Sequence, residues 1–334
     1  MSDNESMKAA WFESFGTAKD VLNVGEFEKP RAGPGEVLVR LQTSGVNPSD
    51  VKKRAGSFPD LLDAGPVIPN SDGAGIVEAV GEGVDAARIG ERVWIYQAQF
   101  ARQLGTAAEY VAIDHSRAPR LPDNTSFEVG ACLGIPAMTA HRCVFSDGDV
   151  TGRQLLITGG AGRVGNYAIQ WASRAGASVI ATASNEADVK TCRQAGASIV
   201  VNHRSEHFAA EVLDATDGML VDRVIDVEFG ANLAAMLEVI KVGGTISTYS
   251  STVLPEPKLP FFRMMYKDLT VRFVIVYAMP ESAKQFAIAD IEKALQRDEL
   301  IHRVADKFLL NDIAVANESI ESGSIHGCVV LTIV

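Results

Sequence analysis

The sequence predicts an α/β protein in which a β-rich, barrel-like domain is followed by a doubly wound parallel sheet of six strands. Residues 1–126 contain short apolar stretches separated by Gly and Pro turns, whereas helical and strand patterns alternate over residues 127–297. A glycine-rich turn joins a strand to a helix within residues 154–175. With 334 residues, the chain also exceeds the size that one hydrophobic core usually supports, so two domains are expected.

The first domain is expected to be a compact barrel. Its predicted strands cover residues 7–12, 21–27, 36–42, 76–80, 92–96 and 107–113. Pro48 and Asp50 suit the first turn of a helix that follows the third of these strands. Residues 300–334 have the pattern of strands with a short helix between them. We expect them to return to this domain, which then comprises residues 1–126 and 298–334.

The second domain, residues 127–297, is expected to alternate between strands and helices. The predicted strands cover residues 154–158, 178–183, 198–201, 222–227, 245–250 and 270–276. The predicted helices cover residues 166–175, 187–195, 206–215, 232–240 and 281–297. Strands that are joined by helical crossovers form a parallel sheet, which binds ligands at the carboxyl ends of its strands.

The glycine turn predicts what that ligand is. Gly160, Gly162 and Gly165 follow an apolar strand and precede a helix, and a further strand comes after that helix. In a dinucleotide site the first glycine permits the tight turn, the second lets the backbone approach the pyrophosphate, and the third lets the helix pack on its strand. A G-x-G-x-x-G pattern alone is weak evidence, but this strand–turn–helix context makes a dinucleotide site the expected function.

Composition excludes several other functions. The net charge of −11 argues against general binding to nucleic acid or to anionic membranes. There is no run of 18 apolar residues, and the first residues are polar and acidic rather than a signal peptide, so a cytoplasmic protein is expected. The four cysteines are widely spaced, which favours buried free thiols over disulfides or a cysteine-rich zinc site.

Several motifs occur in the order that is typical of one family. The matching stretches are Gly45-Val-Asn-Pro48, residues 72–81, Gly90-Glu-Arg-Val93, residues 107–111, Gly134-Ile-Pro136 with Thr139-Ala140, the glycine turn, Asn202-His-Arg204 and Val242-Gly-Gly244. Over nearly its whole length the chain resembles the medium-chain dehydrogenase/reductase superfamily, and within it the zinc-free, zeta-crystallin-like NADPH:quinone oxidoreductases. This resemblance implies a GroES-like catalytic domain and a Rossmann domain that binds NADPH.

The zinc-free branch is favoured by the residues at two positions. Zinc alcohol dehydrogenases of this superfamily place a Cys after the first long strand and a Gly-His-Glu before the Gly-x-Gly-Ile-Val segment. This chain has Val46 or Asn47 at the first position and Asn70-Ser71-Asp72 at the second. Neither position offers a thiolate or an imidazole, and the four-cysteine lobe of those enzymes is also absent from the sequence. We therefore expect no metal.

The choice between NADPH and NADH depends on the end of the second Rossmann strand. An NAD site usually places Asp or Glu there, whereas this chain has Ala183-Ser184-Asn185. His203 and Arg204 follow the next strand and are able to bind a 2′-phosphate. The alternative is that His203 is an ordinary loop residue and Arg204 a solvated surface charge. The resemblance assigns the phosphate to the positions of Ser184 and His203, which favours NADPH. Asp188 departs from relatives that carry a Lys there.

The resemblance also implies the remaining cofactor contacts. It assigns Ala161, Gly162, Arg163 and Val164 to the pyrophosphate, and Asn232, Tyr249, Ser250 and Ser251 to the ribose and nicotinamide. It assigns the carboxamide to Val274, Ile275 and Val276 in the last strand, whose pattern alone predicts a plain strand core. Thr139 is expected to contact the nicotinamide, and Lys52 occupies the position of a cofactor-contacting Tyr.

Quinone reduction by direct transfer from the nicotinamide is the expected activity, with one-electron transfer also associated with the family. Asn47 is expected to bind an acceptor oxygen and Asp50 to join a proton relay, but a helix-capping role for Asp50 is equally consistent with its position. An NADPH-dependent alkenal or enone reductase is the nearest alternative, and an NADPH-binding protein without turnover is another. The apolar residues 271–277 at a sheet edge predict a homodimer formed through the last strand.

Overall fold

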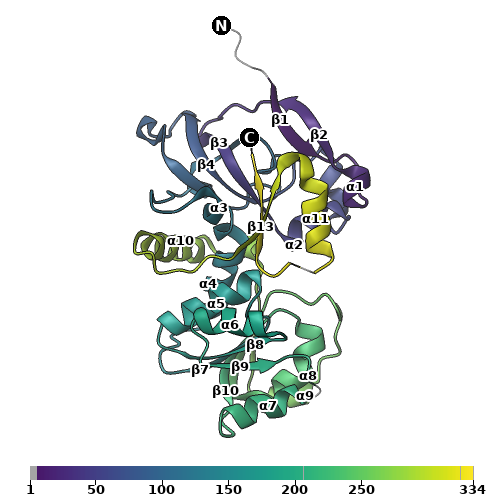
Figure 1. Ribbon diagram of the computed structural model, residues 1–334, viewed down its shortest axis with the longest axis vertical. Helices are drawn as coiled ribbons and strands as arrows, with labels where there is room; N and C mark the ends of the chain where they lie inside the picture. The colour runs from purple at the N-terminus through teal and green to yellow at the C-terminus, as the bar shows by residue number, and fades with distance from the viewer. Residues whose placement is uncertain (1–5, 206, 324, 334) are drawn as a thin grey trace. The chain divides into compact units, whose positions relative to one another are not determined.

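The chain forms two compact units, one of which is discontinuous in sequence. A computed structural model describes residues 6–205, 207–323 and 325–333 (Figure 1). The first unit comprises residues 1–135 and 288–334, and the second comprises residues 136–287. The sequence placed the boundaries near residues 126 and 297. The long helix α10 (Glu281–Gln296) contains the second of the observed boundaries, and for this reason no turn signal marks it.

The first unit is built on a mainly antiparallel sheet. Its strands lie in the order β13-β14-β3-β4-β5, and β6 also pairs with β3. The bounds are β3 (Glu36–Val46), β4 (Asp72–Val80), β5 (Arg92–Ile95), β6 (Tyr110–Asp114), β13 (Val304–Leu309) and β14 (Cys328–Thr332). β1 (Ser6–Trp11) and β2 (Asn23–Glu28) form a separate antiparallel pair. Apolar residues from these strands, among them Val39, Ile95 and Leu331, make one buried core.

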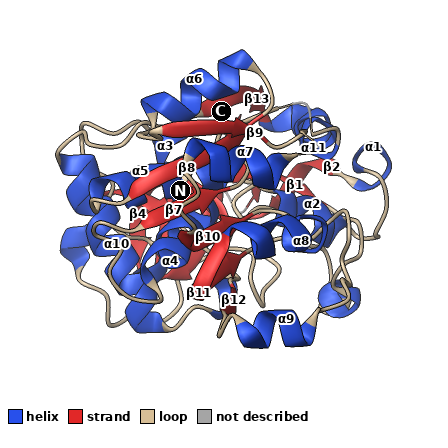
Figure 2. Ribbon diagram, turned by 90° about the horizontal axis from the view of Figure 1, so that it is seen from below, coloured by secondary structure: helices blue, strands red, loops and turns tan. Residues whose placement is uncertain are grey.

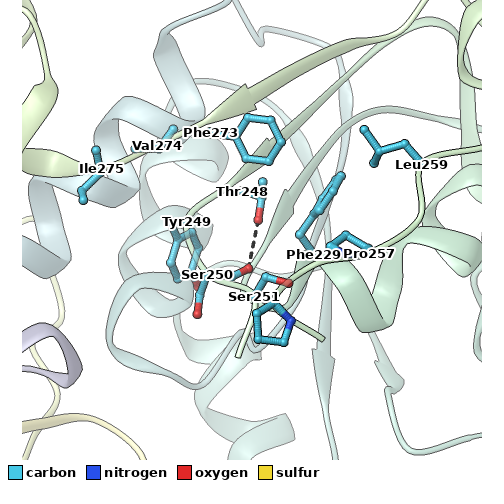
Figure 3. Close-up of a pocket in the computed structure, with 11 residues that line it drawn as sticks. Phe229, Thr248, Tyr249, Ser250, Ser251, Pro257, Leu259, Phe273, Val274 and Ile275 are labelled. Atoms are coloured by element: carbon cyan, nitrogen blue, oxygen red, sulfur yellow. Dashed lines mark hydrogen bonds between the residues drawn. The ribbon is translucent and has the colours of Figure 1, made fainter. Parts of the chain in front are cut away.

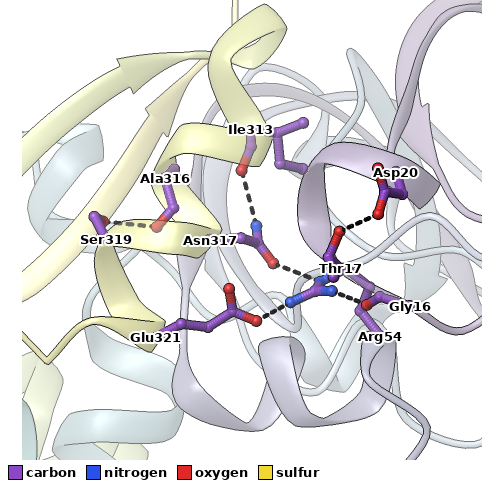
Figure 4. Close-up of polar contacts among 9 residues, drawn as sticks. All are labelled: Gly16, Thr17, Asp20, Arg54, Ile313, Ala316, Asn317, Ser319 and Glu321. Atoms are coloured by element: carbon purple, nitrogen blue, oxygen red, sulfur yellow. Dashed lines mark hydrogen bonds and ion pairs between the residues drawn. The ribbon is translucent and has the colours of Figure 1, made fainter.

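The last part of the chain returns to the first unit, as the sequence predicted. β14 pairs antiparallel with β3, and α11 (Ile313–Glu321) packs against α2 (Pro48–Arg54). Arg54 is only 1% exposed, and its guanidinium donates to the carbonyl of Gly16, to Asn317 Oδ1 and to the carboxylate of Glu321 (Figure 4). These contacts tie the C-terminal helix to the helix that carries Asp50. The remaining helices of this unit are α1 (Ala18–Val21) and α3 (Phe127–Gly130).

The second unit contains the expected six-stranded parallel sheet, in the order β12-β11-β10-β7-β8-β9. The bounds are β7 (Gln154–Ile157), β8 (Ser178–Ala183), β9 (Ile199–Asn202), β10 (Val221–Asp226), β11 (Ile240–Thr248) and β12 (Thr270–Phe273). The helices are α4 (Met138–Phe145), α5 (Arg163–Arg174), α6 (Glu186–Gln194), α7 (Phe208–Ala215), α8 (Phe229–Val239) and α9 (Phe261–Tyr266). α4 and α5 pack together on one face of the sheet, and α7 and α8 on the other (Figure 2).

Several predicted boundaries in this unit were wrong, among them the start of β11, which lies at Ile240 rather than at residue 245. α5 begins at Arg163 rather than at residue 166, because Gly162 already acts as its N-cap. α8 begins at Phe229 rather than at residue 232, because the loop after β11 accepts its first N–H groups: Phe229 N–H donates to Ser250 O at 2.9 Å. β12 ends at Phe273, so Val274, Ile275 and Val276 lie beyond the strand, although Val274 N–H still donates to Thr248 O.

None of the helices within the described residues is both long and apolar enough to cross a membrane.

Candidate functional site

The glycine turn after β7 has the geometry that a dinucleotide site needs. Gly162 is the N-cap of α5, so the N–H groups of the first turn of that helix have no carbonyl partners inside the helix. A Cβ atom on Gly165 would lie 2.2 Å from the carbonyl oxygen of Gly159, so only glycine permits this close packing. A Cβ atom on Gly162 would meet only Gly159 O, at 3.1 Å, which leaves the outer side of the turn open to a ligand.

The role that the sequence assigned to Gly160 belongs to its neighbour. Gly159 has the left-handed conformation of the tight turn, with φ 61°, whereas Gly160 has no positive φ. Gly160 is required for packing instead, because a Cβ atom there would lie 2.8 Å from the Sγ of Cys192. Cys192 lies on α6, so Gly160 allows this helix to approach the turn.

The predicted 2′-phosphate residues lie at one edge of the sheet. β8 and β9 are adjacent and parallel, with Ala183 beside Asn202, so Ser184 and His203 follow paired positions. Ser184 is half-buried, and His203 and Arg204 are exposed. Asp188 is 4% exposed, and it takes part in capping α6: its N–H donates to Asn185 Oδ1 at 2.9 Å, and its Oδ2 accepts from Asn185 Nδ2 at 2.7 Å. The acid that departs from the family pattern thus has a structural role in the cap.

A buried carboxylate that the sequence did not single out braces the carboxyl ends of β7 and β10. Asp226 Oδ1 accepts from Thr158 Oγ1 and from Asn232 Nδ2, both at 2.8 Å, and Asp226 Oδ2 accepts from Glu228 N–H at 2.9 Å. Burial raises the pKa of Asp226, while these hydrogen bonds act in the opposite direction. Asn232 therefore points toward Asp226 from the first turn of α8. Its position at the end of a parallel strand is the signal that would have identified Asp226.

A pocket of about 420 Å³ lies at the carboxyl ends of β11 and β12 (Figure 3). Its lining is aromatic, aliphatic and hydroxylated: Phe229, Thr248, Tyr249, Ser250, Ser251, Pro255, Pro257, Leu259, Phe273, Val274 and Ile275. The structure thus brings together five of the predicted cofactor residues, namely Tyr249, Ser250, Ser251, Val274 and Ile275. The volume falls within the range of small-molecule sites.

One wall of this pocket is held by Glu228. Its carboxylate accepts the N–H groups of Thr252 at 2.8 Å and of Val253 at 3.0 Å. Ser251 Oγ accepts from Gly230 N–H and donates to Leu254 O. A Cβ atom on Gly230 would lie 2.1 Å from Leu254 O. These contacts fix residues 251–254 against the N-terminus of α8, and so determine where the pocket wall begins.

Other predicted cofactor residues do not line this pocket. Val276 is 3% exposed and begins a short 3₁₀ turn after the pocket residues. Thr139 is 4% exposed on α4, in the second unit. Lys52 is exposed on α2, in the first unit. Their roles toward a cofactor stay predictions.

The predicted catalytic residues belong to a buried polar cluster of the first unit, which we call the α2 cluster and define as Asn47, Asp50, Lys53 and Asp72. Asn47 N–H donates to Asp50 Oδ2 at 2.9 Å, which is the capping contact that the sequence left open as an alternative. Asn47 Nδ2 donates to Asp72 Oδ2 at 2.9 Å, and Ile135 N–H donates to the same oxygen at 2.8 Å. The Nζ of Lys53 donates to the carbonyl of Gln99.

Burial dominates the electrostatics of the α2 cluster. It raises the pKa of Asp50 to about 6, although Lys53 and the hydrogen bonds from Asn47 oppose the shift. Burial also raises the pKa of Asp72 well above its ordinary value, and Asp50 adds to this effect. The same burial lowers the pKa of Lys53. Burial therefore moves the pKa of all three ionisable members away from its ordinary value, as is often seen in functional groups.

Two family models match separate parts of the chain. Residues 33–123 match the alcohol dehydrogenase GroES-like domain, and residues 164–293 match the zinc-binding dehydrogenase domain. Within the described residues, no group of three or more His, Cys, Asp or Glu side chains is arranged to hold a metal ion.

Two proteins of similar sequence and one solved structure support the same family. Quinone oxidoreductase of Rattus norvegicus is 32% identical over 72% of each chain, and 2-methylene-furan-3-one reductase of Solanum lycopersicum is 29% identical over 78% of this chain and 65% of its own. The structure of mycobacterial Rv1454c in complex with NADPH superposes with a TM-score of 0.86 at 27% identity, covering 98% of this chain and all of the other.

The fold and the glycine turn define a two-domain oxidoreductase of the dinucleotide-binding class. The chain belongs to the medium-chain dehydrogenase/reductase family, in which quinone oxidoreductases are among its relatives.

Proposed function

We propose that the protein is a zinc-independent, NADPH-dependent oxidoreductase that reduces quinones. The observation that carries this proposal is the single pocket that collects Tyr249, Ser250, Ser251, Val274 and Ile275. None of the side chains that line it is charged, and its aromatic and apolar groups suit a nicotinamide ring and a flat, uncharged acceptor. The similarity to a rat quinone oxidoreductase supports the same acceptor class.

The residues present fit NADPH. We assign the pyrophosphate to Gly160, Ala161, Gly162, Arg163, Val164 and Gly165, where an added Cβ atom would fill the turn. We assign the 2′-phosphate to Ser184, His203 and Arg204, which follow adjacent strands, and further contacts to Lys52, Thr139, Asn232 and Val276. When bound, NADPH supplies a hydride, so that a quinone takes up the hydride and one proton and leaves as the hydroquinone, with NADP⁺ as the other product.

The side chains of the first unit serve the acceptor in this proposal. Asn47 uses one Nδ2 hydrogen for Asp72 and offers the other to an acceptor oxygen. Asp50, whose pKa is raised to about 6, is able to exchange a proton near neutral pH. Both side chains are at most 3% exposed, so an acceptor meets only their outermost atoms.

We also propose that two copies pair through β12. Within the described sheet β12 is a terminal strand, so one of its edges has no neighbouring strand. Large apolar side chains are exposed on and beside it, namely Phe261, Phe262, Met265, Tyr266, Phe273 and Ile275. Antiparallel pairing across a two-fold axis would cover both features. Light scattering on the wild type and on Phe262→Lys tests this: we expect a dimer that the variant weakens, and a monomeric wild type would contradict it.

An NADPH-dependent alkenal or enone reductase is the second candidate. The similarity to 2-methylene-furan-3-one reductase favours it, because that protein's name describes an activated carbon–carbon double bond. The two activities use the same cofactor and fold and differ in the atom that receives the hydride.

The deciding experiment is oxidation of NADPH and of NADH with 9,10-phenanthrenequinone and with a short alkenal. We expect turnover of the quinone and a preference for NADPH that Ser184→Asp reverses. Turnover of the alkenal alone would contradict the proposal that the acceptor is a quinone but would agree with the proposed cofactor site. Binding of NADPH without turnover of any acceptor in a broad panel would leave a binding protein as the function.

A further inference from the structure

The α2 cluster holds two carboxyl groups but only one cation. Its members are almost completely buried, with 2% exposure for Asp50, 5% for Lys53 and 0% for Asp72. A charged group inside a protein is unfavourable unless an opposite charge compensates it. Lys53 compensates one carboxylate. If both Asp50 and Asp72 were ionised, the cluster would therefore carry a buried negative charge without a counter-ion.

The geometry distinguishes the two carboxyl groups. Asp50 and Lys53 are three residues apart on α2, a spacing that brings side chains to the same face of a helix. Asp72 lies on β4, and its Oδ2 receives the two hydrogen bonds from Asn47 and Ile135. Like Oδ1 of Asp50, its Oδ1 is buried and has no hydrogen-bond partner in the described part of the chain, so this feature alone does not tell the two groups apart. A Cβ atom on Gly134 would lie 2.1 Å from this oxygen, so backbone packs directly against it.

We propose that Asp72 is a positioning residue that holds Asn47 as a neutral carboxylic acid, while Asp50 and Lys53 form the single ion pair of the cluster. The proposal rests on the proposed function, because Asn47 matters only if it serves an acceptor. A proton on Oδ1 leaves Oδ2 as the acceptor of both N–H groups. Among the described residues, Asp50 and Lys53 are the charged groups that act on Asp72, and burial together with the charge of Asp50 raises the pKa of Asp72.

Neutrality of Asp72 suits the proposed reaction. Reduction places negative charge on the acceptor oxygen, and a donor that is already oriented stabilises this charge. A neutral Asp72 fixes the amide of Asn47 without adding a negative charge beside it. An ionised Asp72 would hold the same amide but would repel the charge that develops on the acceptor. A protonated Asp72 therefore orients the amide of Asn47 without repelling the negative charge on the acceptor oxygen, whereas an ionised Asp72 would do both.

Infrared spectroscopy tests the protonation state without any substrate. At neutral pH we expect the wild type to show the carbonyl stretch of a buried carboxylic acid, shifted in D₂O. Asp72→Asn should lose this band, and Asp63→Asn, which changes an exposed carboxyl group of the same unit, should keep it. A wild type without a band that Asp72→Asn removes would overturn the proposal. Because no turnover is needed, this result stands even if the protein reduces no quinone.

Kinetics test the positioning role. We expect Asp72→Ala to lower kcat by about 30- to 100-fold with a smaller change in KM, because Asn47 loses the acceptor that orients it. Asp72→Asn, which keeps an oxygen at Oδ2, should restore kcat to within about threefold of the wild type. The wild type should also lose activity at alkaline pH as Asp72 ionises, whereas Asp72→Asn should not. An Asp72→Asn variant as impaired as Asp72→Ala would mean that the negative charge is needed, and would overturn the proposal.

Discussion

Asp72 of the first unit and Asp226 of the second unit are both 0% exposed, and the two aspartates have different surroundings. Asp226 of the second unit uses both carboxylate oxygens, which accept three hydrogen bonds from uncharged donors. Asp72 of the first unit uses one oxygen for two donors and leaves the other without a partner in the described residues, next to a cluster that contains Lys53. A carboxylate with both oxygens hydrogen-bonded braces the fold, whereas one with a single hydrogen-bonded oxygen is, in our proposal, the group that holds a proton.

The difference shows that burial alone does not reveal the role of an ionisable group. Burial raises the pKa of both aspartates. The two aspartates differ in the number of N–H and O–H groups that donate to the carboxylate. A buried donor without an acceptor lowers the stability of the fold, so a carboxylate with more donors has more reason to stay ionised. The following predictions, from the largest effect to the smallest, test this distinction.

Lys53→Met should have the largest effect, because it removes the cation from the α2 cluster. Removing one partner of a buried ion pair typically costs about 3–5 kcal/mol. The loss in the free energy of unfolding, measured by urea denaturation, should shrink at acid pH, where Asp50 is protonated and needs no partner. Lys52→Met, on the exposed neighbour, should change stability by less than about 0.5 kcal/mol. Equal losses in both variants would show that no ion pair is present.

The pH dependence of stability should reveal Asp50. Its pKa is raised from 3.8 to about 6 in the folded protein, so the folded state binds the proton more tightly than the unfolded state does. The contribution of this group is therefore fully present below the ordinary value and is lost as pH rises through about 6. Two pKa units correspond to about 3 kcal/mol. The difference in unfolding free energy between wild type and Asp50→Asn, measured across this range, should follow that curve, and a constant difference would contradict it.

The same substitution at the two aspartates should separate their roles. Asp226→Asn places an NH₂ group opposite a donor whichever way the amide is turned, so we expect a loss of about 1–3 kcal/mol. Asp72→Asn places the NH₂ group at the oxygen without a partner and should cost less than about 1 kcal/mol. Thermal or urea unfolding of both variants measures the two losses. The reverse order would mean that Asp72 is the anion and Asp226 the neutral acid.

Glu228→Gln should have the smallest effect, because this carboxylate binds backbone N–H groups near the surface rather than inside the fold. One of its two oxygens becomes a donor, which weakens the attachment of residues 252–254. We expect a loss of about 1 kcal/mol in NADPH binding, or about fivefold in Kd by calorimetry. Glu256→Gln, an exposed change in the same segment, is the matched control and should leave Kd unaltered. Equal increases in Kd for Glu228→Gln and Glu256→Gln would mean that the lost negative charge, and not the lost hydrogen bond, weakens NADPH binding.

The sequence was most informative where function depends on the backbone. The glycine turn and the six parallel strands follow from local patterns, and the packing at Gly165 confirms that no side chain fits there. The capping contact between Asn47 and Asp50 joins residues that are three apart in the sequence, so it could be predicted from the sequence. The partner of Asn47 at Asp72 lies 25 residues away, and that of Thr158 at Asp226 lies 68 residues away. No periodicity encodes such contacts, so both aspartates escaped a functional assignment.

Element boundaries failed for the same reason. The loop after β11 supplies the acceptor for the first N–H of α8, so the start of this helix depends on residues that come 21 positions later. α9 was not predicted, because all of its residues except Arg263 are large and apolar or aromatic, so the sequence shows no separate polar face of the kind that marks a helix; none of these residues is buried. Local sequence patterns predict the helices and strands that bury one face. They do not predict the elements that depend on tertiary contacts.

The antiparallel pairing of β14 with β3 has a consequence for biosynthesis. Residues 328–332 add a strand to a sheet that begins in the first tenth or so of the chain, and Arg54 finds its partners on the helix just before them. A ribosome completes residues 136–287 before it reaches this strand, so the parallel sheet is able to fold during synthesis. The first unit must wait with an unpaired edge of β3 until translation is nearly finished, and such an exposed edge favours aggregation.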